Sequence, residues 1–355
     1  MKAVRVCVWD TDGVNPFGRE VAIQFSERGL ETRLFIPVDT EWLPGGAVTT
    51  HRTLPGNRGG RSKLRQIWSE FVSLLRLIVT ARPRRVIVVA FTRTVVEDLV
   101  LASMARVGQR VLVVAHEASP RTRPSTARAI STRILWSSCE LVALSRDVQS
   151  ALGLPSHLCT HPPYRGWVAW ARPQVVARRS SRGADHTVLV LGQVRQDKGL
   201  VELFDVFAAL PDDGRRSLRV VIAGKGTLPP GFVESLRTMV QVEDLTGGQF
   251  LSDLKIAELL ASADVLLAPY VNASQSGTML LALSWGIPVA AYATGAVADH
   301  VPASSLAPVH DAEALASRLT SALGGAIVAV DVDAWSEESA AAWVDAARRP
   351  LGAAP

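Results

Sequence analysis

The sequence predicts an α/β protein with two doubly wound domains, each built on a parallel sheet. Short runs of Val, Ile and Leu alternate with helical patterns along most of the 355 residues. Runs such as VIVVA and VLVVA contain no polar position, which is typical of strands buried on both faces of a parallel sheet. The length fits two domains better than one, and 48% apolar with 20% charged residues excludes a disordered chain.

In the first half, each strand is predicted from an apolar run and each helix from the periodic segment between two runs. We expect strands near residues 3–9, 31–37, 85–90, 110–115 and 141–144. Helices are expected near residues 18–28, 63–80, 95–106 and 147–152. The longest apolar helical stretch covers about half of a bilayer and contains Arg76, so no membrane-spanning helix is predicted.

A linker is predicted at residues 171–186, where ARPQVVARRSSRGAD is rich in Arg and Ser and has little periodicity. It separates an N-terminal domain, residues 1–170, from a C-terminal α/β domain, residues 187–330. Residues 331–355 contain a predicted final helix with two tryptophans, Trp335 and Trp343, on one face. That face either packs back on the first domain or belongs to an ordinary capping helix.

Cysteine usage and the N-terminus favour a cytoplasmic protein. Cys7, Cys139 and Cys159 stand far apart, which predicts buried free thiols rather than a disulfide framework or a zinc site. The chain starts MKAVRVCVWD, and Asp10 and Asp12 come too early for the apolar region of a signal peptide.

Charge is divided unevenly between the two halves. Residues 1–175 contain 24 Lys and Arg against 13 Asp and Glu, net +11, whereas the remainder contains 14 against 20. An anionic partner is therefore expected for the first half. Residues 52–85 hold nine basic residues and a single acid, Glu70. The helix in this segment either lies on anionic lipid or packs on the sheet with a solvated basic face. Nucleic acid is not expected as a partner, because aromatic residues are not interleaved with the charges.

Two segments of the second half are typical of anion-binding turns. In GQVRQDKG, Arg195 and Lys198 follow a strand and precede a helix. In SGTMLLALSW, the small residues Ser276, Gly277 and Thr278 open a wholly apolar helix. The backbone N–H groups at such a helix start, together with the helix dipole, attract an anion. Two such elements at strand ends predict a nucleotide-diphosphate ligand.

These positions also have simpler interpretations. Lys198 and Arg195 would be unremarkable as surface charges, as would Lys225 in AGKGT, and Ser276 is a common helix cap. Capping does not account for Gly277, however, and ligands of α/β proteins bind at strand ends. The predicted diphosphate site therefore consists of Arg195, Lys198, Lys225, Ser276, Gly277 and Thr278.

In order along the chain, four segments resemble the C-terminal domain of family 4-like glycosyltransferases (glycosyl transferases group 1) of the GT-B fold. They are VLVLGQVRQDKGLVELFDVFAAL, LRVVIAGKG, ASADVLLAPY and SGTMLLALSWGIPVAAYATGAVADHV, within residues 188–301. NPFGREVAIQFSERGLETRLF, VVAHE, VALSRDVQSAL and HPPYRG resemble the family's acceptor domain more loosely. The resemblance implies two facing Rossmann-like domains with the active site in the cleft between them. It also implies that the diphosphate ligand is a nucleotide sugar, a substrate rather than a cofactor.

Two departures from the family pattern leave the stereochemistry open. Better-known retaining members carry two glutamates eight positions apart, where this chain has Ala273 and Leu281. The arginine that often follows the first glycine is here Gln193, with Arg195 as its substitute. The forms V-R-x-x-K-G and S-G-T-x-x-L-A-L are closer to the subgroup that builds exopolysaccharides and lipid-linked oligosaccharides.

In the first half, the resemblance places His116 against the donor sugar, although a lone histidine is more often structural. Glu117 beside it is the candidate base towards an acceptor hydroxyl. On the loop after the first strand, Asp12 is a further catalytic candidate and Asn15 an acceptor-binding candidate. Asp10 and Asp12 would suit a divalent ion, but no third ligand presents itself and GT-B enzymes usually act without a metal. Neither a metal nor a cofactor is therefore expected.

Together these observations predict a metal-independent hexosyltransferase at the inner face of the membrane. It would move a sugar from a nucleotide-diphosphate sugar to a hydroxyl of a lipid-linked or polysaccharide-precursor acceptor. A nucleotide-sugar 2-epimerase of the same fold, and a non-catalytic relative that binds a glycan or a partner protein, remain alternatives. The fate of the donor distinguishes the three alternatives: a transferase moves its sugar to an acceptor, an epimerase isomerises it, and a non-catalytic relative leaves it unchanged.

Overall fold

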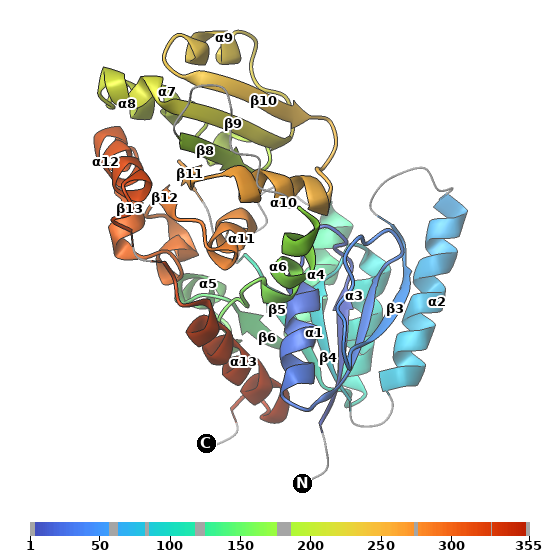
Figure 1. The fold of residues 1–355 in the computed structure, drawn as a ribbon. Coiled ribbons are helices and arrows are strands. Elements are labelled where there is room, and N and C mark those ends of the chain that lie inside the picture. The colour runs from blue at the N-terminus through green and yellow to red at the C-terminus, as the bar shows by residue number, and fades with distance from the viewer. Residues whose placement is uncertain are drawn as a thin grey trace. The chain divides into compact units, whose positions relative to one another are not determined.

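A computed structural model of the chain describes residues 4–56, 63–81, 85–117, 125–175, 186–272, 276–327 and 329–352, without the side chains of residues 63–65. The chain divides into two compact units, Met1–Pro162 with Asp333–Pro355, and Pro163–Val332. Each unit is a parallel sheet with helices on both faces (Figure 1). The boundary falls between Pro162 and Pro163, ahead of the segment 171–186 that the sequence indicates as a linker. Within that segment Arg172–Gln174 form a short 3-10 helix, and residues 176–185 lie outside the described residues.

The first unit is built on a seven-stranded sheet in the order β3-β2-β1-β4-β5-β6-β7. The strands are β1 (Arg5–Asp10), β2 (Glu31–Pro37), β3 (Thr49–Leu54), β4 (Arg85–Phe91), β5 (Val111–Ala115), β6 (Glu140–Ala143) and β7 (Ser156–Leu158). The helices are α1 (Phe17–Glu27), α2 (Lys63–Ala81), α3 (Val95–Arg106), α4 (Thr126–Ser138), α5 (Arg146–Leu152) and the last helix of the chain, α13 (Val332–Arg348). Strand order reverses between β1 and β4, which is where doubly wound sheets bind ligands.

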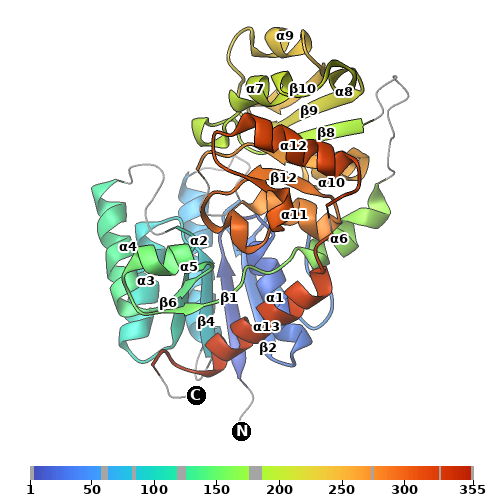
Figure 2. The same ribbon diagram turned by 90° about the vertical axis from the view of Figure 1, so that its left-hand side faces the viewer.

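Helix α13 packs beside α1 on one face of this sheet (Figure 2). Trp343 is fully buried, and its ring meets Phe17 and Phe25 edge-on at 5.9 and 6.3 Å. Its indole N–H donates to the carbonyl of Thr160 at 3.1 Å, and that of Trp335 donates to the carbonyl of His161 at 2.7 Å. Helices α2, α3 and α4 share the core on the opposite face.

The second unit repeats the same topology with six strands, in the order β10-β9-β8-β11-β12-β13. The strands are β8 (His186–Leu191), β9 (Leu218–Lys225), β10 (Gln241–Gly247), β11 (Val265–Ala268), β12 (Val289–Tyr292) and β13 (Leu306–Ala307). The helices are α6 (Arg165–Ala171), α7 (Glu202–Ala208), α8 (Asp212–Arg216), α9 (Phe232–Arg237), α10 (Asp253–Ser262), α11 (Gly277–Trp285) and α12 (Ala312–Leu323). Here the order reverses between β8 and β11, so the loops after these two strands lie side by side.

Candidate functional site

The turn between β8 and α7 is fastened to the segment that follows β11. Arg195 pairs with Asp197, Nε to Oδ1 at 2.9 Å and Nη2 to Oδ2 at 2.7 Å. The backbone carbonyl of Asp197 accepts the amide of Val271 at 3.2 Å. Gly199 ends the turn with φ at 58°, and a Cβ there would lie 1.9 Å from the carbonyl oxygen of Pro269. Only glycine therefore allows the two segments to approach this closely.

Lys198 is held between these two segments. Its side chain is nearly buried, and its Nζ lies 3.7 Å from the centroid of the Tyr270 ring, a cation–π contact. Both residues line a pocket at the carboxyl end of β8, together with Gly192 and Val194. Burial raises the pKa of the Tyr270 phenol, so its hydroxyl stays protonated and serves as a hydrogen-bond donor.

A directed chain of hydrogen bonds joins Tyr270 to the start of α11. The carbonyl of Leu191 can only accept, so the Tyr270 hydroxyl donates to it at 2.9 Å. The Tyr270 oxygen must then accept from the Thr278 hydroxyl at 3.0 Å, and Thr278 in turn from the Ser276 hydroxyl at 3.0 Å. Ser276 finally accepts the amide of Met279 at 3.4 Å. The end of β8 and the first turn of α11 thus form one network.

The cap of α11 is arranged so that it does not compete with an anion. Ser276 is the N-cap residue, and its side chain uses the amide of Met279. The amides of Gly277 and Thr278 belong to the first turn, whose N–H groups have no acceptor within the helix. These two amides and the Lys198 ammonium are the groups suited to a diphosphate.

Lys225 is the last residue of β9, beside the turn that follows β8. Its carbonyl accepts the amide of Val194 at 2.8 Å, and its ammonium lies 4.4 Å from the ring centroid of Phe250. The predicted cations therefore lie at the carboxyl ends of the adjacent strands β8 and β9.

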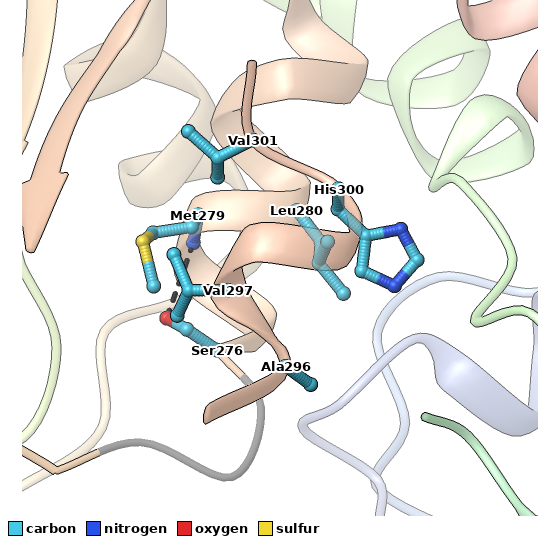
Figure 3. A pocket seen from close by; sticks show the side chains of 7 residues that line it. All are labelled: Ser276, Met279, Leu280, Ala296, Val297, His300 and Val301. Carbon is cyan, nitrogen blue, oxygen red and sulfur yellow. Dashed lines mark hydrogen bonds between the residues drawn. The ribbon is translucent and has the colours of Figure 1, made fainter. Parts of the chain in front are cut away.

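A second pocket borders the start of α11 (Figure 3). Met279, Val297 and Val301 give it apolar walls, and His300 lies at its other side. Burial lowers the pKa of His300 to about 4, so this imidazole is neutral at physiological pH. Of the two family glutamate positions, Leu281 is buried within α11, and Ala273 lies outside the described residues.

In the first unit, the predicted loop residues shape the turn after β1. Asp12 Oδ1 accepts the amides of Val14 at 2.9 Å and Asn15 at 3.2 Å, and Asn15 Oδ1 accepts the amide of Phe17 at 3.0 Å. The buried guanidinium of Arg19 donates to carbonyls of the same loop. The turn is rigid because its side chains replace the missing backbone partners.

His116 follows β5 and is fixed by its surroundings. Its ring stacks on Phe91 at 4.2 Å and meets Phe17 edge-on at 4.9 Å. Nε2 lies 3.0 Å from the carbonyl of Ala90, which can only accept, so Nε2 carries the proton and Nδ1 is the acceptor nitrogen. Burial lowers the pKa of His116 to about 4, which keeps the ring neutral. Glu117 follows directly, and its side chain is half-buried.

Asp10, at the end of β1, is a buried carboxyl that the sequence did not single out as a site residue. Its Oδ1 accepts the amide of Asp12 at 2.9 Å, and Oδ2 has no hydrogen-bond partner among the described residues. Burial and the charge of Asp12 raise the pKa of Asp10 to about 8. Within the described residues, no group of three or more His, Cys, Asp or Glu side chains is placed to hold a metal ion.

One family model matches part of the sequence of the second unit. Residues 185–324 match the family model of glycosyl transferases group 1. The matched segment runs from β8 to α12 and contains Lys198, Tyr270 and the start of α11. Over this segment the chain is therefore similar to group 1 glycosyltransferases. No curated protein sequence matches it.

Solved structures that cover almost the whole chain have the same fold. Sucrose-phosphate synthase from Thermosynechococcus elongatus is 15% identical with a TM-score of 0.61, covering 97% of this chain and 94% of that one. The UDP-forming trehalose-phosphate synthase from Burkholderia xenovorans is 12% identical, with a TM-score of 0.62 and coverage of 99% and 100%. Anabaena HepE, solved with UDP and glucose, is 15% identical, with a TM-score of 0.57 and coverage of 96% and 100%. The predicted α/β GT-B fold is thereby confirmed.

The predicted site residues fall into two sets, one in each unit. Within the second unit, Lys198, Ser276 and Thr278 meet through Tyr270, and Gly277 lies between the last two. Within the first unit, Asn15 and His116 both contact Phe17. Tyr270 is not among the residues predicted from the sequence. The only indication of it there is an aromatic residue directly after ADVLLAP.

None of the described helices is long and apolar enough to cross a membrane.

Proposed function

We propose that the chain is a hexosyltransferase that moves a sugar from a nucleotide-diphosphate sugar to a hydroxyl of a carbohydrate acceptor. One observation carries this proposal: the buried Lys198, its Tyr270 partner and the first turn of α11 meet at the strand-order reversal of the second sheet. A cation and two helix N-terminal amides there suit a diphosphate. HepE, which shares the fold, has been solved with UDP-glucose, so UDP-sugars are the first donors to test.

In this proposal, the second unit stabilises the departing diphosphate. Lys198, Arg195 and Lys225, with the amides of Gly277 and Thr278, are the groups that would offset negative charge as the glycosidic bond breaks. This electrostatic role requires neither a metal nor a cofactor.

The first unit would supply the acceptor site and, for an inverting reaction, the base. We assign Asn15 to acceptor binding, and His116, Glu117 and Asp12 to the catalytic set. A neutral His116 with Nδ1 as an acceptor can receive a hydrogen bond from a sugar hydroxyl. With a pKa of about 4, it is a weaker proton acceptor than an ordinary histidine, so we assign His116 to hydrogen bonding with the sugar and keep Glu117, directly beside it, as the proposed base.

We further propose that the acceptor is a lipid-linked or polysaccharide precursor, presented at the cytoplasmic face of a membrane. The V-R-x-x-K-G and S-G-T-x-x-L-A-L forms support this subgroup, and the basic segment 52–85 is the proposed membrane contact.

The test is a thermal-shift panel of UDP, GDP and ADP and their sugars, followed by product analysis with the best donor. A ligand that binds only the folded state raises the melting temperature. Transfer to an added acceptor supports the proposal. Isomerised donor would replace it with epimerisation, and absence of any nucleotide binding would refute it. Lys198→Met is the test variant for the donor site, because it removes the cation while keeping an unbranched side chain.

A further inference from the structure

Helix α2 exposes a continuous apolar ridge. Ile67, Phe71, Leu75 and Val79 follow one another at i, i+4 spacing and are 63, 57, 50 and 67% exposed. Trp68, 67% exposed, lies beside Phe71 with ring centroids 5.9 Å apart. At 1.5 Å per residue, the ridge is about 18 Å long. These five residues are called the α2 ridge below.

The ridge is not needed to hold α2 in place. Leu74, Leu77 and Ala81, on another side of the helix, are buried in the core with α3 and α4. The helix lies at the edge of the first unit, next to the edge strand β3 (Figure 1). Among the side chains described, no other helix exposes more than two large apolar residues. A concentration of this kind marks an interaction surface.

The surroundings of the ridge are positively charged. Arg76 on α2 is exposed. Burial lowers the pKa of His51 on β3, and the neighbouring charges of Arg33 and Arg76 lower it further. Glu70, the one acid between residues 52 and 85, accepts a hydrogen bond from the Thr94 hydroxyl at the start of α3. This hydrogen bond orients the Glu70 carboxylate towards α3.

We propose that the α2 ridge is a membrane-docking surface, with its apolar side chains in the interface of an anionic lipid layer and Arg76 at the headgroups. Tryptophan and phenylalanine on the apolar side, with arginine on the polar side, are typical of helices that lie in such an interface. A second copy of the chain fits less well. A two-fold symmetric contact places the same patch on both sides and would bring like charges together.

This inference rests on the proposed function only for its purpose, which is to bring the enzyme to a lipid-linked acceptor. Lipid binding is measured without donor or acceptor, so its failure and that of sugar transfer are distinguishable.

The first experiment is sedimentation of the full-length protein with two kinds of vesicles. One kind is phosphatidylcholine alone, and the other is phosphatidylcholine with an equal part of phosphatidylglycerol. The wild type should bind the anionic vesicles in preference, and salt should weaken binding. The double variant Trp68→Ser/Phe71→Ser should lose about tenfold or more of its partition coefficient. Ile130→Ser on α4 is the matched control, since Ile130 is 56% exposed and outside the ridge.

Charge is tested with Arg76→Glu against Arg216→Glu. Both variants change the net charge equally, and Arg216 is an exposed residue of the second unit. Only Arg76→Glu should weaken binding to anionic vesicles.

Insertion itself is measured by quenching of tryptophan emission with brominated lipid. Trp68→Phe keeps an aromatic ridge, so it should still bind while losing most of the quenching. Equal binding by the ridge and control variants overturns the proposal. So does a dimer, seen by sedimentation velocity, that the double variant dissociates.

Discussion

The Lys198 ammonium lies 3.7 Å from the centroid of the Tyr270 ring, and this contact joins the loop after β8 to the loop after β11. The aromatic ring attracts the cation through its negative face. The contact holds the ammonium in a nearly buried position at the carboxyl end of β8.

Lys198→Met should weaken nucleotide binding without unfolding the chain. A charge-assisted contact contributes on the order of 1.5–3 kcal/mol, so the dissociation constant should rise at least tenfold. Isothermal titration with the best nucleotide measures this. Lys255→Met is the control, because Lys255 is exposed and pairs with Glu258 on the surface. Equal affinities for Lys198→Met and wild type would show that Lys198 does not contact the ligand.

Gly277→Val should abolish nucleotide binding, whereas Ser276→Ala should weaken it less. Valine would place a side chain between the ligand and the first-turn amides of α11, but the amides remain in Ser276→Ala. Because Ser276 is the N-cap residue of α11, Ser276→Ala should also lower the free energy of unfolding by about 1 kcal/mol. Melting curves and titrations are compared for both variants. A stable Gly277→Val protein with full affinity would contradict the proposed site.

Gly199→Ala should be markedly more destabilising than Gly231→Ala. Both glycines have positive φ, 58° and 76°, so both substitutions strain the backbone. Only at Gly199 would the new Cβ also meet a carbonyl oxygen, that of Pro269, at 1.9 Å. Chemical denaturation gives the free energy of unfolding of each variant, and the difference between the two is the cost of the clash with the Pro269 carbonyl oxygen. Similar losses of stability would mean that the segment after β11 moves aside easily.

The sequence predicts most strands of the fold because parallel strands in the centre of a sheet are continuous apolar runs. β3 was not predicted, since its sequence TTHRTL is polar and lies at the edge of the sheet. α4 was not predicted either, because TARAISTRILWSS has only two buried positions, Ser131 and Leu135. β7 was not predicted because it is short and none of its residues is buried.

Lys198 and Ser276 can be proposed as site residues from the sequence, because each belongs to a local turn with a recognisable pattern. Tyr270 cannot be proposed in this way, because its hydrogen bonds involve Leu191 and Thr278, which reach it only through the folded sheet. The burial of Asp10 cannot be predicted either, since nothing in DTDGVN distinguishes a carboxyl that will be buried from one that will be exposed.

Asp10→Asn should stabilise the protein, and more so at alkaline pH. The pKa of Asp10 is raised from 3.8 to about 8 in the folded state, so the folded protein binds a proton that the unfolded chain releases. Stability therefore falls as pH rises from about 4 to about 8, by up to about 1.4 kcal/mol per pH unit from this group. Asparagine is neutral throughout and can still accept the amide of Asp12. Denaturation at pH 5 and pH 9 should show a larger gain at pH 9. An equal gain in stability at pH 5 and pH 9 would show that Asp10 does not titrate between these two pH values.

Glu140→Gln should loosen the C-terminal helix and change acid stability. Glu140 accepts two hydrogen bonds from Arg110, at 2.7 and 2.9 Å, while Arg110 also donates to the carbonyls of Ala346 and Ala347 at the end of α13. Burial alone would raise the pKa of Glu140, but the bonds from Arg110 and His157 lower it to about 2.

A lowered pKa means that the unfolded chain takes up the proton first, so this stabilisation is complete above about pH 4.5 and is lost as pH falls towards 2. Glu140→Gln should cost about 1.5–3 kcal/mol at neutral pH, and its stability should depend less on pH below 4.5. Hydrogen exchange of the α13 amides should rise in the variant. Glu258→Gln, at an exposed surface pair, should change neither quantity. If α13 exchanges as slowly in Glu140→Gln as in the wild type, the helix is held by the buried Trp343 alone.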